Sequence, residues 1–318
     1  MSVPTKILIA EPDDFSPSVV QYLSEFADVT LRHTQRSELK RVLEEYDVLW
    51  FRLAWRIDES VLDESARCRY LVTPVTGIDH IDEALCKRLG VKIICLRGER
   101  EFLKEVRATS ELAVALAMTL MRNIPQAIDD VKAGNWRRDL FRGNELYKKT
   151  AAVIGFGRLG RIVAQYFKAF GMTVKAYDPR PDIERLEGVY FCQSMEEAVS
   201  DSHVVTLHIN YTKDTHEIIG PEFYTWCRSD AVLVNTSRGG LLDESALLSA
   251  LHTKEIKGAA LDVVQDEGSF DKDNPLLHYS RTHNNLIIVP HIGGNTFESF
   301  VKTEQFVAEK LKSHVYSS

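Results

Sequence analysis

The chain has 318 residues, a formal net charge of −7, 44% hydrophobic residues and 27% charged residues. This length is enough for two ordinary domains, and the composition is typical of a globular protein. The negative charge argues against a nucleic-acid-binding surface, and no apolar run approaches the length of a membrane-spanning helix.

Five scattered cysteines, none of them in a CxxC pair, favour reduced thiols over a disulfide framework or a metal site. Residues 1–5 lead directly into a strand-like segment and lack the apolar core of a signal peptide, so we expect a cytoplasmic protein. We expect neither a membrane nor a nucleic acid as a partner, and no regulatory domain beyond residue 318.

Residues 1–102 alternate short apolar runs with helical patterns, which predicts a parallel sheet covered by helices on both faces. The predicted strands are 6–10, 48–52, 70–73 and 92–95, and the predicted helices are 16–26, 36–45, 59–66 and 79–89. Ligands of such sheets bind at the carboxyl ends of the strands. Arg52 stands at one strand end and is suited either to an anionic substrate or to an ion pair. Backbone N–H groups of Thr76 and Gly77 suit a carboxylate, and Asp79 suits a helix N-cap.

Residues 97–107 are dense in charge. Such a segment is typical either of a solvated surface or of a site that gathers arginines against an anionic substrate. The long helix predicted over 109–123 has apolar residues on more than one face, so we expect it to be buried against the core or a second subunit.

The motif Gly155-x-Gly157-x-x-Gly160 joins a short apolar run to a helical pattern. This order is that of a dinucleotide-binding turn. Gly155 allows a sharp turn, Gly157 leaves room for a pyrophosphate, and Gly160 lets the helix pack close to the strand. Arg158 and Leu159 begin the helix, where free N–H groups attract phosphates.

Asp178 follows the next predicted strand, 173–177. An acid at this point can accept hydrogen bonds from the hydroxyls of the adenosine ribose, which favours NAD over NADP. Asp178 before Pro179 is also ordinary turn chemistry, and Arg180 is a candidate for holding a 2′-phosphate.

About six strands are predicted after residue 150, the number in a complete doubly wound dinucleotide domain. Polar residues follow the later strands, where the cofactor is expected; they are Asn235, Thr236, Arg238, Asp262, Asp266, Glu267 and His291. The helix predicted over 296–314 is expected to return to the first domain. We therefore predict a substrate domain of residues 1–102 completed by 292–318, and a dinucleotide-binding domain of residues 103–291.

Reduction of a 2-oxo acid requires a cation for the carboxylate and carbonyl, a proton donor, and a group that keeps this donor protonated. Arg238, His291 and Glu267 suit these roles in that order, with the hydride coming from the cofactor. Each also has a simpler explanation, as an arginine that binds carbonyls, a loop histidine or a surface acid. Pattern alone does not select these three among ten histidines and 46 acidic residues.

Six segments together resemble the D-isomer-specific 2-hydroxyacid dehydrogenases, particularly the branch similar to phosphoglycerate dehydrogenase. They are Val75–Asp79, Gly155–Gly160, Leu207–His208 followed by Thr215, Val234–Gly239, Ala260–Val263 and Pro290–Gly294. The resemblance extends from about residue 73 to residue 298. It implies an α/β fold with two doubly wound parallel-sheet domains, a Rossmann NAD-binding domain and a discontinuous flavodoxin-like substrate domain.

The resemblance also implies roles for single residues. The catalytic trio would be Arg238, Glu267 and His291. Contacts to NAD are implied at Gly155, Gly157, Arg158, Leu159, Gly160, Asp178, His208, Thr236 and Asp262. Contacts to the substrate are implied at Arg52, Thr76 and Gly77. The family's usual homodimer, formed through the long central helix, is expected as well.

Three positions depart from the family pattern: Gly268 and Asn210 stand where proline is usual, and Val264 stands where an aromatic residue is usual. These departures leave the trio intact and the identity of the acid open. The predicted function is NAD-dependent interconversion of a 2-oxo acid and a D-2-hydroxy acid. The alternatives are oxidation of a small inorganic or one-carbon acid, and an NAD(H)-sensing protein that binds a partner without turnover.

Overall fold

The computed structural model describes residues 5–316. Residues 1–4, where no signal peptide is expected, and residues 317–318, the end of the expected C-terminal segment, lie outside the described part. The chain divides into two compact units, Met1–Val106 with Asn295–Ser318, and Arg107–Gly294. The boundaries expected from the sequence fall a few residues earlier, after residues 102 and 291. Within residues 5–316, none of the helices is both long and apolar enough to cross a membrane.

The first unit is built on a five-stranded parallel sheet in the order β2-β1-β3-β4-β5. The strands are β1 (Thr5–Ile9), β2 (Ala27–Leu31), β3 (Val48–Trp50), β4 (Tyr70–Val72) and β5 (Lys92–Ile94). Its helices are α1 (Pro17–Ser24), α2 (Leu39–Glu45), α3 (Glu83–Leu89), α4 (Arg100–Leu103) and α12 (Phe297–Tyr316), with the 3-10 helix η1 (Arg36–Glu38).

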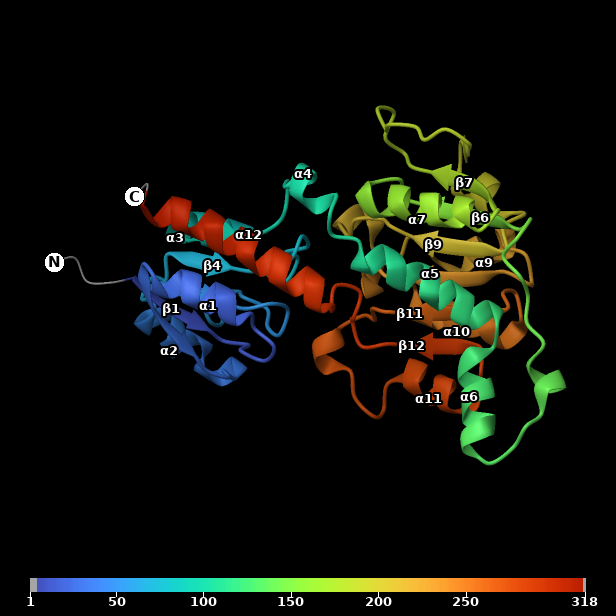
Figure 1. Ribbon diagram of the computed structural model, residues 1–318, viewed down its shortest axis with the longest axis horizontal. Helices are drawn as coiled ribbons and strands as arrows, with labels where there is room; N and C mark the ends of the chain where they lie inside the picture. Colours follow the sequence, from blue (N-terminus) through green and yellow to red (C-terminus); the bar gives the residue numbers. More distant parts are fainter. Residues whose placement is uncertain (1–4, 317–318) are drawn as a thin grey trace. The chain divides into compact units, whose positions relative to one another are not determined.

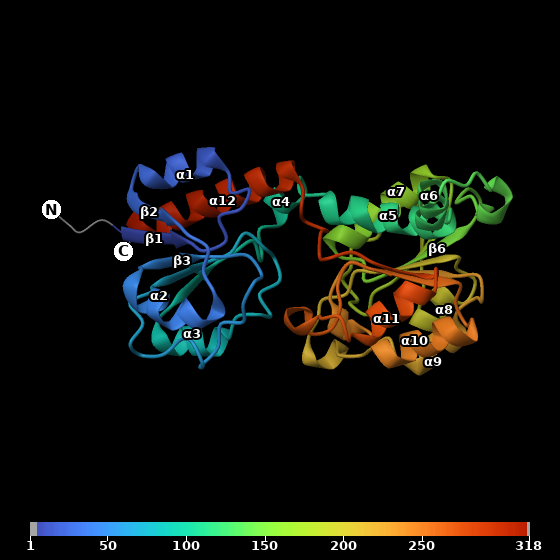
Figure 2. The same ribbon diagram turned by 90° about the horizontal axis from the view of Figure 1, so that it is seen from below.

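Both faces of this sheet are covered by helices, α1 and α12 on one side and α2 and α3 on the other (Figure 2). Alternate residues of a strand point to opposite faces. Accordingly Ile7 and Ile9 of β1 pack in the cluster that contains α1 and α12, whereas Leu8 packs in the cluster that contains α2 and α3. Helix α12 lies beside α1, so the end of the chain completes the core of its beginning (Figure 1).

The second unit is built on a seven-stranded parallel sheet in the order β12-β11-β10-β9-β6-β7-β8. The strands are β6 (Thr150–Ile154), β7 (Thr173–Tyr177), β8 (Val189–Phe191), β9 (Val204–Leu207), β10 (Val232–Asn235), β11 (Gly258–Leu261) and β12 (Leu286–Ile288). The α-helices are α5 (Ala108–Met121), α6 (Ile124–Lys132), α7 (Arg158–Ala169), α8 (Met195–Val199), α9 (Pro221–Trp226), α10 (Glu244–Thr253) and α11 (Pro275–Thr282). Four 3-10 helices complete it: η2 (Arg138–Phe141), η3 (Lys213–Thr215), η4 (Gly239–Leu241) and η5 (Glu267–Ser269).

Helices α5 and α7 cover one face of this sheet, and α8, α9, α10 and α11 cover the other (Figure 2). Counted within the unit, the strand order is 3-2-1-4-5-6 with one further strand, which is the Rossmann order. The first unit has the order 2-1-3-4-5 of flavodoxin-like sheets. The prediction of an α/β fold with two doubly wound parallel sheets is confirmed.

Two local predictions were wrong, and two strands were missed. Residues 59–66 form turns rather than a helix, because the Asp58 and Asp63 carboxylates accept hydrogen bonds from the backbone N–H groups of Ser60 and Ser65, which competes with helix formation. Helix α3 begins at Glu83 and is capped by Asp82, not by Asp79. Strands β2 and β8, each at the edge of its sheet, were not predicted.

Candidate active site

The glycine motif forms the turn between β6 and α7, and two of its glycines have no space for a side chain. Gly155 has a φ of +91°, and a Cβ built on it would lie 2.4 Å from the carbonyl oxygen of His208. A Cβ on Gly160 would lie 2.2 Å from the carbonyl oxygen of Gly155. Because glycine has no Cβ, the turn can be tight and the helix can lie close to the strand.

Gly157 differs from its neighbours, because it faces open space. Within residues 5–316 and apart from its neighbours along the chain, the nearest atom to a Cβ built on it is Nη2 of Arg180, at 3.8 Å. Helix α7 begins at the next residue, Arg158, and its N-cap, Gly157, has no side chain with which to cap the helix. Burial lowers the pKa of Arg158, and the carbonyl oxygen of Leu159 accepts a hydrogen bond from Ser110. An open helix N-terminus beside a bare glycine fits a pyrophosphate.

Asp178 follows β7, and its carboxylate is almost completely covered. Oδ2 accepts hydrogen bonds from the Phe156 N–H at 2.8 Å and from Arg180 Nη2 at 2.6 Å. Oδ1 accepts from Arg180 Nε at 2.8 Å and from the Arg180 N–H at 3.1 Å. Burial opposes ionisation, but these bonds outweigh it and hold the pKa of Asp178 below its ordinary value.

Two buried polar atoms at expected cofactor positions lack a hydrogen-bond partner within residues 5–316. They are Nδ1 of His208 and Oγ1 of Thr236. The other ring nitrogen of His208 lies 3.0 Å from Oγ1 of Thr206. Burial lowers the pKa of His208 to about 3, so the imidazole is neutral near pH 7. Buried polar atoms without partners are uncommon in folded proteins, and with the glycine turn they fit a site for a dinucleotide.

Arg238 projects from the turn that follows β10. The fully buried Asn235 shapes this turn by donating to the carbonyl oxygen of Arg238 at 2.9 Å and accepting from the N–H of Ser237 at 3.0 Å. Ser237 in turn donates to the carbonyl oxygen of Leu207 at 2.8 Å. A Cβ on Gly239 would overlap the backbone of Val264, so only glycine fits after the arginine. The position of Arg238 is thus set by buried polar groups.

His291 and Glu267 form a direct pair. Nδ1 of His291 lies 2.7 Å from Oε2 of Glu267, and both side chains are partly exposed. Within residues 5–316, the structure provides no partner for Nε2 of His291. Glu267 follows β11 and His291 follows β12, and β10, β11 and β12 are consecutive strands of the sheet. Because parallel strands end at the same edge, these two residues and Arg238 come from adjoining strand ends.

Asp262 follows β11 and holds the loop that carries His291. Its carboxylate accepts hydrogen bonds from the N–H of Ile292 at 2.6 Å and from the N–H of Gly293 at 2.8 Å, and its carbonyl oxygen accepts from the N–H of His291 at 2.8 Å. Burial raises the pKa of Asp262, although the two N–H groups oppose this effect. The sequence suggested a cofactor contact, and the structure assigns both oxygens a role in positioning the loop.

The candidate substrate residues of the first unit differ in their surroundings. Thr76 and Gly77 lie in the loop between β4 and α3, and within residues 5–316 their backbone N–H groups have no acceptor. Arg52 is already engaged, because Nη2 lies 2.8 Å from Oε1 of the fully buried Glu304, and its guanidinium stacks on Phe300. The two N–H groups of Thr76 and Gly77 are therefore suited to an anion. Arg52 instead forms an ion pair, which was one of its two roles expected from the sequence.

Similarity to known proteins agrees with this arrangement. The profile "D-isomer specific 2-hydroxyacid dehydrogenase, NAD binding domain" matches residues 114–293, more than half of the chain. The chain belongs to the D-isomer specific 2-hydroxyacid dehydrogenase family. The matched region includes the glycine turn, Asp178, Arg238, Glu267 and His291, and the resemblance inferred from six sequence segments is confirmed.

Comparisons over nearly the whole of this chain find several similar proteins. D-3-phosphoglycerate dehydrogenase of Methanocaldococcus jannaschii is 34% identical over 310 residues, which are 96% of this chain and 57% of that protein. The chain therefore spans little more than half the length of that relative. Hydroxypyruvate reductase of Thermotoga maritima is 29% identical over 306 residues, covering 96% of this chain and 97% of that protein. The structure of D-lactate dehydrogenase from Aquifex aeolicus, complexed with NAD and lactic acid, has a TM-score of 0.84 and 27% identity, covering 98% of this chain and 96% of that chain.

Two residues that hold loops of the candidate site in this family member were not identified from the sequence. Glu244 accepts a hydrogen bond at 2.6 Å from the N–H of Gln265, two residues before Glu267, and burial raises its pKa. No local pattern separates Glu244 from other acids that begin helices. Gly293 is the second, because a Cβ there would lie 2.7 Å from Oδ2 of Asp262. The sequence did contain a signal for Gly293, because this residue lies within Pro290–Gly294, one of the six segments that resemble the family.

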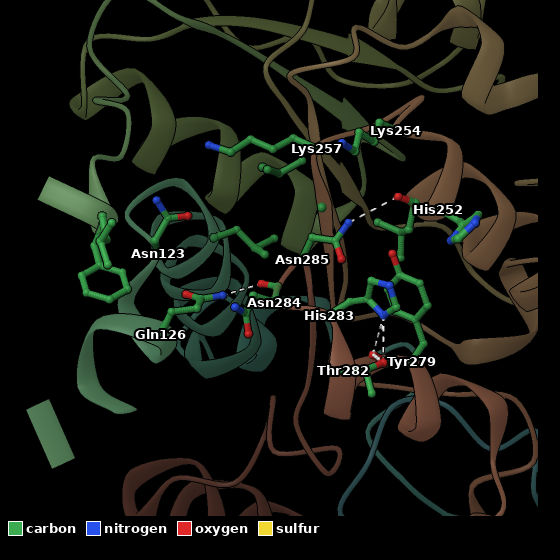
Figure 3. Close-up of a pocket in the computed structure, with 16 residues that line it drawn as sticks. Asn123, Gln126, His252, Lys254, Lys257, Tyr279, Thr282, His283, Asn284 and Asn285 are labelled. Carbon is green, nitrogen blue, oxygen red and sulfur yellow. Dashed lines mark hydrogen bonds between the residues drawn. The ribbon is translucent and has the colours of Figure 1, made fainter. Parts of the chain in front are cut away.

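A pocket of about 650 Å³ in the second unit of this family member is separate from these residues. It is lined at the opposite edge of the sheet by Val232 and Gly258, the first residues of β10 and β11, and by Asn285 just before β12. Figure 3 shows Lys257 and His283 among its other polar residues. None of the lining residues belongs to the candidate active site. Within residues 5–316, no group of three or more His, Cys, Asp or Glu side chains is arranged to hold a metal ion.

The charge-rich segment 97–107 makes contacts within the first unit. Arg97 pairs with Glu83 at 2.8 Å, and Glu99 pairs with Lys310 of α12 at 2.6 Å. Phe102 stacks on Phe306 of the same helix, with ring centroids 4.0 Å apart. Glu99 and Phe102 therefore hold α12 against the rest of the unit, a structural role that neither interpretation of the segment's charge had included.

Proposed function

We propose that this chain interconverts a 2-oxo acid and the corresponding D-2-hydroxy acid, with NAD(H) as the redox cofactor. The observation that carries the proposal is the His291–Glu267 pair, 2.7 Å apart. An imidazole hydrogen-bonded to a carboxylate is a general acid–base unit, and a protein that only senses a dinucleotide does not require one. Membership of the 2-hydroxyacid dehydrogenase family supports the same reaction.

The second unit offers the groups that would hold the cofactor. The N–H groups at the start of α7 would bind the pyrophosphate beside Gly157, and Asp178 would bind the adenosine ribose. Thr236 and His208 would offer their unpartnered polar atoms. When bound, the nicotinamide supplies or accepts the hydride. The family relationship favours NAD, and Asp178 supports that choice.

His291 is proposed to transfer the proton. Because Nδ1 faces Glu267, the other ring nitrogen, Nε2, is the one that can give a proton to the substrate oxygen or take it back. The Glu267 carboxylate, hydrogen-bonded to Nδ1, fixes the orientation of the ring. In the reverse direction the neutral imidazole removes the hydroxyl proton.

Arg238 is proposed to bind the substrate carboxylate and to polarise the carbonyl. Its guanidinium keeps its charge and presents a planar fork of donors, which matches a carboxylate. Thr76 and Gly77 of the first unit, whose N–H groups have no acceptor within residues 5–316, are proposed as substrate contacts in their own right. Arg52 is a weaker candidate, because Glu304 already occupies its guanidinium.

The test is consumption of NADH by the purified chain with a panel of 2-oxo acids, from glyoxylate and pyruvate to hydroxypyruvate and phosphorylated acids. We expect turnover of at least one acid, oxidation of only the D-enantiomer in the reverse direction, and a loss of about 10²-fold or more in His291→Gln. NADH binding without turnover of any acid would favour the sensing alternative. Oxidation of formate or an inorganic acid alone would favour the alternative in which the chain oxidises a small inorganic or one-carbon acid.

We also propose that the chain forms a homodimer. Helix α5, which the sequence suggested as the interface, packs largely against α7 and the sheet of its own unit. The following helix, α6, carries the exposed apolar residues Ile124, Ile128 and Val131, and Trp136 just beyond it is also exposed. Apolar groups gathered in this way are typical of a subunit contact. Light scattering should give twice the chain mass, and Ile128→Glu should give a monomer.

A further inference from the structure

The pocket at the edge where the strands of the seven-stranded sheet begin has a lining without acidic side chains. Within residues 5–316, none of the 16 residues that line it is Asp or Glu, although the chain as a whole has a formal net charge of −7. Its volume of about 650 Å³ is typical of small-molecule sites. All of its lining lies in the second unit, so the pocket is formed by one compact part of the chain.

Three amide side chains at this pocket present oxygen atoms without donors. Each uses its NH₂ group to donate to a backbone carbonyl oxygen, and the pairs are Asn123 with Arg142 at 3.2 Å, Gln126 with Asn284, and Asn285 with Leu251 at 3.4 Å. These bonds fix the orientation of the amides. Within residues 5–316, none of the three amide oxygens accepts a hydrogen bond, and those of Gln126 and Asn285 are buried. The pocket therefore provides three acceptors that a ligand with N–H donors would satisfy.

Lys257 supplies a positive charge to the same pocket. Its side chain is half-buried, and within residues 5–316 its ammonium group has no hydrogen-bond or ion-pair partner. Asp230 attracts it from a greater distance, but the carboxylate of Asp230 is bound by Arg228 at 2.7 Å. Burial lowers the pKa of Lys257, and an anion beside the ammonium group would oppose this effect. Figure 3 shows the Lys257 side chain extending to the side of the pocket where Asn123 and Gln126 lie.

Helix ends add partial charges of both signs. Helices α5, α10 and α11 end at the pocket, where their carboxyl ends carry partial negative charge, and α6 begins there with the opposite charge. An ammonium group suits the three helix ends and the amide oxygens, because it carries three donors. A carboxylate suits Lys257. A dianion such as a phosphate ester fits less well, because it brings no donors for the amide oxygens and is repelled by three helix ends.

The remaining wall of the pocket can accept an apolar group. Leu120, Leu140 and Phe141 line it. The rings of Tyr279 and His283 are stacked with centroids 4.0 Å apart and an interplanar angle of 7°, and they form a flat surface beside the polar groups. An apolar side chain can therefore be bound together with the charged groups of a ligand.

We propose that this pocket binds a small zwitterion of the amino-acid type with an apolar side chain. The carboxylate pairs with Lys257, the ammonium group donates to the amide oxygens, and the side chain lies against the apolar wall. The amide oxygen of Asn123 is accessible, and a small rotation brings those of Gln126 and Asn285 to the ligand. The pocket shares no residue with the candidate active site, so this inference does not depend on the proposed reaction.

The test compares three probes that carry the same aromatic ring. They are L-phenylalanine, 3-phenylpropionate, which lacks the ammonium group, and 2-phenylethylamine, which lacks the carboxylate. Isothermal titration calorimetry of the full chain measures their binding without any need for turnover. We expect saturable binding of L-phenylalanine, and binding of the other two at least about 10-fold more weakly, since each loses charge-assisted hydrogen bonds.

Three variants assign the binding to the pocket. Lys257→Met should weaken L-phenylalanine by at least about 10-fold and should not weaken 2-phenylethylamine, because only the partner of the carboxylate is removed. Asn123→Asp should strengthen 2-phenylethylamine, since a carboxylate replaces an amide, and Asp tolerates the φ of +51° at this position. Lys213→Met is the matched control, because Lys213 is an exposed lysine of η3 in the same unit but outside the pocket lining. It should leave all three affinities unchanged.

The contrary results are distinct from one another. Absence of saturable L-phenylalanine binding would overturn the proposal. Unchanged L-phenylalanine affinity in Lys257→Met would do the same, because the cation of the pocket would then have no part in binding. Binding that is lost in Arg238→Met but retained in Lys257→Met would place the probe in the candidate active site, which would also overturn the proposal.

Discussion

The imidazole of His291 and the carboxylate of Glu267 lie 2.7 Å apart, from Nδ1 to Oε2. Left-handed backbone occurs on both sides of this contact, with φ of +51° at His291 and +49° at Asp266. Such conformations cost on the order of 1 kcal/mol each for residues other than glycine. The hydrogen bonds that the Asp262 carboxylate accepts from the loop after His291 offset this cost. The pair is therefore held in place before any substrate arrives.

Replacing Glu267 by Gln tests the charge of the pair, because the amide can still hydrogen-bond to the imidazole. Reduction should fall by about 10²-fold, because a neutral amide is a weaker hydrogen-bond acceptor than a carboxylate and holds the imidazole less firmly. Steady-state rates of reduction measure the effect. Asp266→Asn is the matched control, as Asn tolerates left-handed backbone and removes a neighbouring charge. A Glu267→Gln variant that reduces the acid at the wild-type rate would contradict the assigned role.

Gly157 and Gly160 should respond differently to a single methyl group. Gly157→Ala should change the free energy of unfolding by no more than about 1 kcal/mol, because its φ is −73° and its Cβ would face open space. It should nevertheless weaken NADH binding strongly, since the methyl group would occupy the proposed pyrophosphate position. Gly160→Ala should instead destabilise the fold by about 2 kcal/mol or more, because its Cβ would overlap the Gly155 carbonyl oxygen. Urea unfolding and NADH fluorescence measure the two properties, and tight NADH binding by Gly157→Ala would count against the site.

Gly293 and Gly294 provide a matched pair in the loop after His291. A Cβ on Gly293 would lie 2.7 Å from Oδ2 of Asp262, whereas a Cβ on Gly294 would meet nothing within 4 Å. Gly293→Ala should therefore displace the loop and reduce kcat at least about 10-fold, because the reacting groups lose their alignment. Gly294→Ala should stay near the wild-type rate. Equal rates in the two variants would show that the Asp262 contacts do not position His291.

Substitution of Arg52 tests whether this arginine stabilises the fold or binds the substrate. Removing one member of a buried ion pair leaves the other charge without a partner, so Arg52→Met should lower the free energy of unfolding by about 3 kcal/mol. Burial already raises the pKa of Glu304, although Arg52 and the N–H of Ser16 oppose this shift. Urea unfolding measures the loss. An Arg52→Met protein with wild-type stability but a greatly raised KM would assign Arg52 to the substrate instead.

His208 should make stability depend on pH below 6.5. Its pKa in the folded protein is lowered to about 3 from 6.5, so between these values the unfolded chain binds a proton that the folded chain does not. Stability is therefore lost as the pH falls, by about 1.4 kcal/mol per pH unit from this residue. Unfolding free energies between pH 6.5 and about 5, above the range of ordinary carboxylates, should show the slope. In His208→Gln, which keeps a polar group near Thr206, the slope should decrease by that amount; an unchanged slope would refute the prediction.

The central strands of both sheets were predictable from the sequence alone. Strands β6, β9, β10 and β11 are buried on both faces, so they appear as continuous apolar runs. The edge strands β2 and β8 are only partly buried, and they were missed. Their extended form depends on hydrogen bonds to β1 and β7, and the local sequence pattern does not reveal such partners.

The same division holds for the site. Six ordered motifs were enough to assign the family and to nominate Arg238, Glu267 and His291, because close backbone approaches and strand ends leave local signatures. Only the tertiary structure decided which atoms these side chains meet. It paired Arg52 with Glu304, 252 residues away, and used Asp262 to hold the loop of His291. Hydrogen-bond partners depend on which atoms folding brings within about 3 Å, and residues distant in the chain carry no local pattern that predicts this.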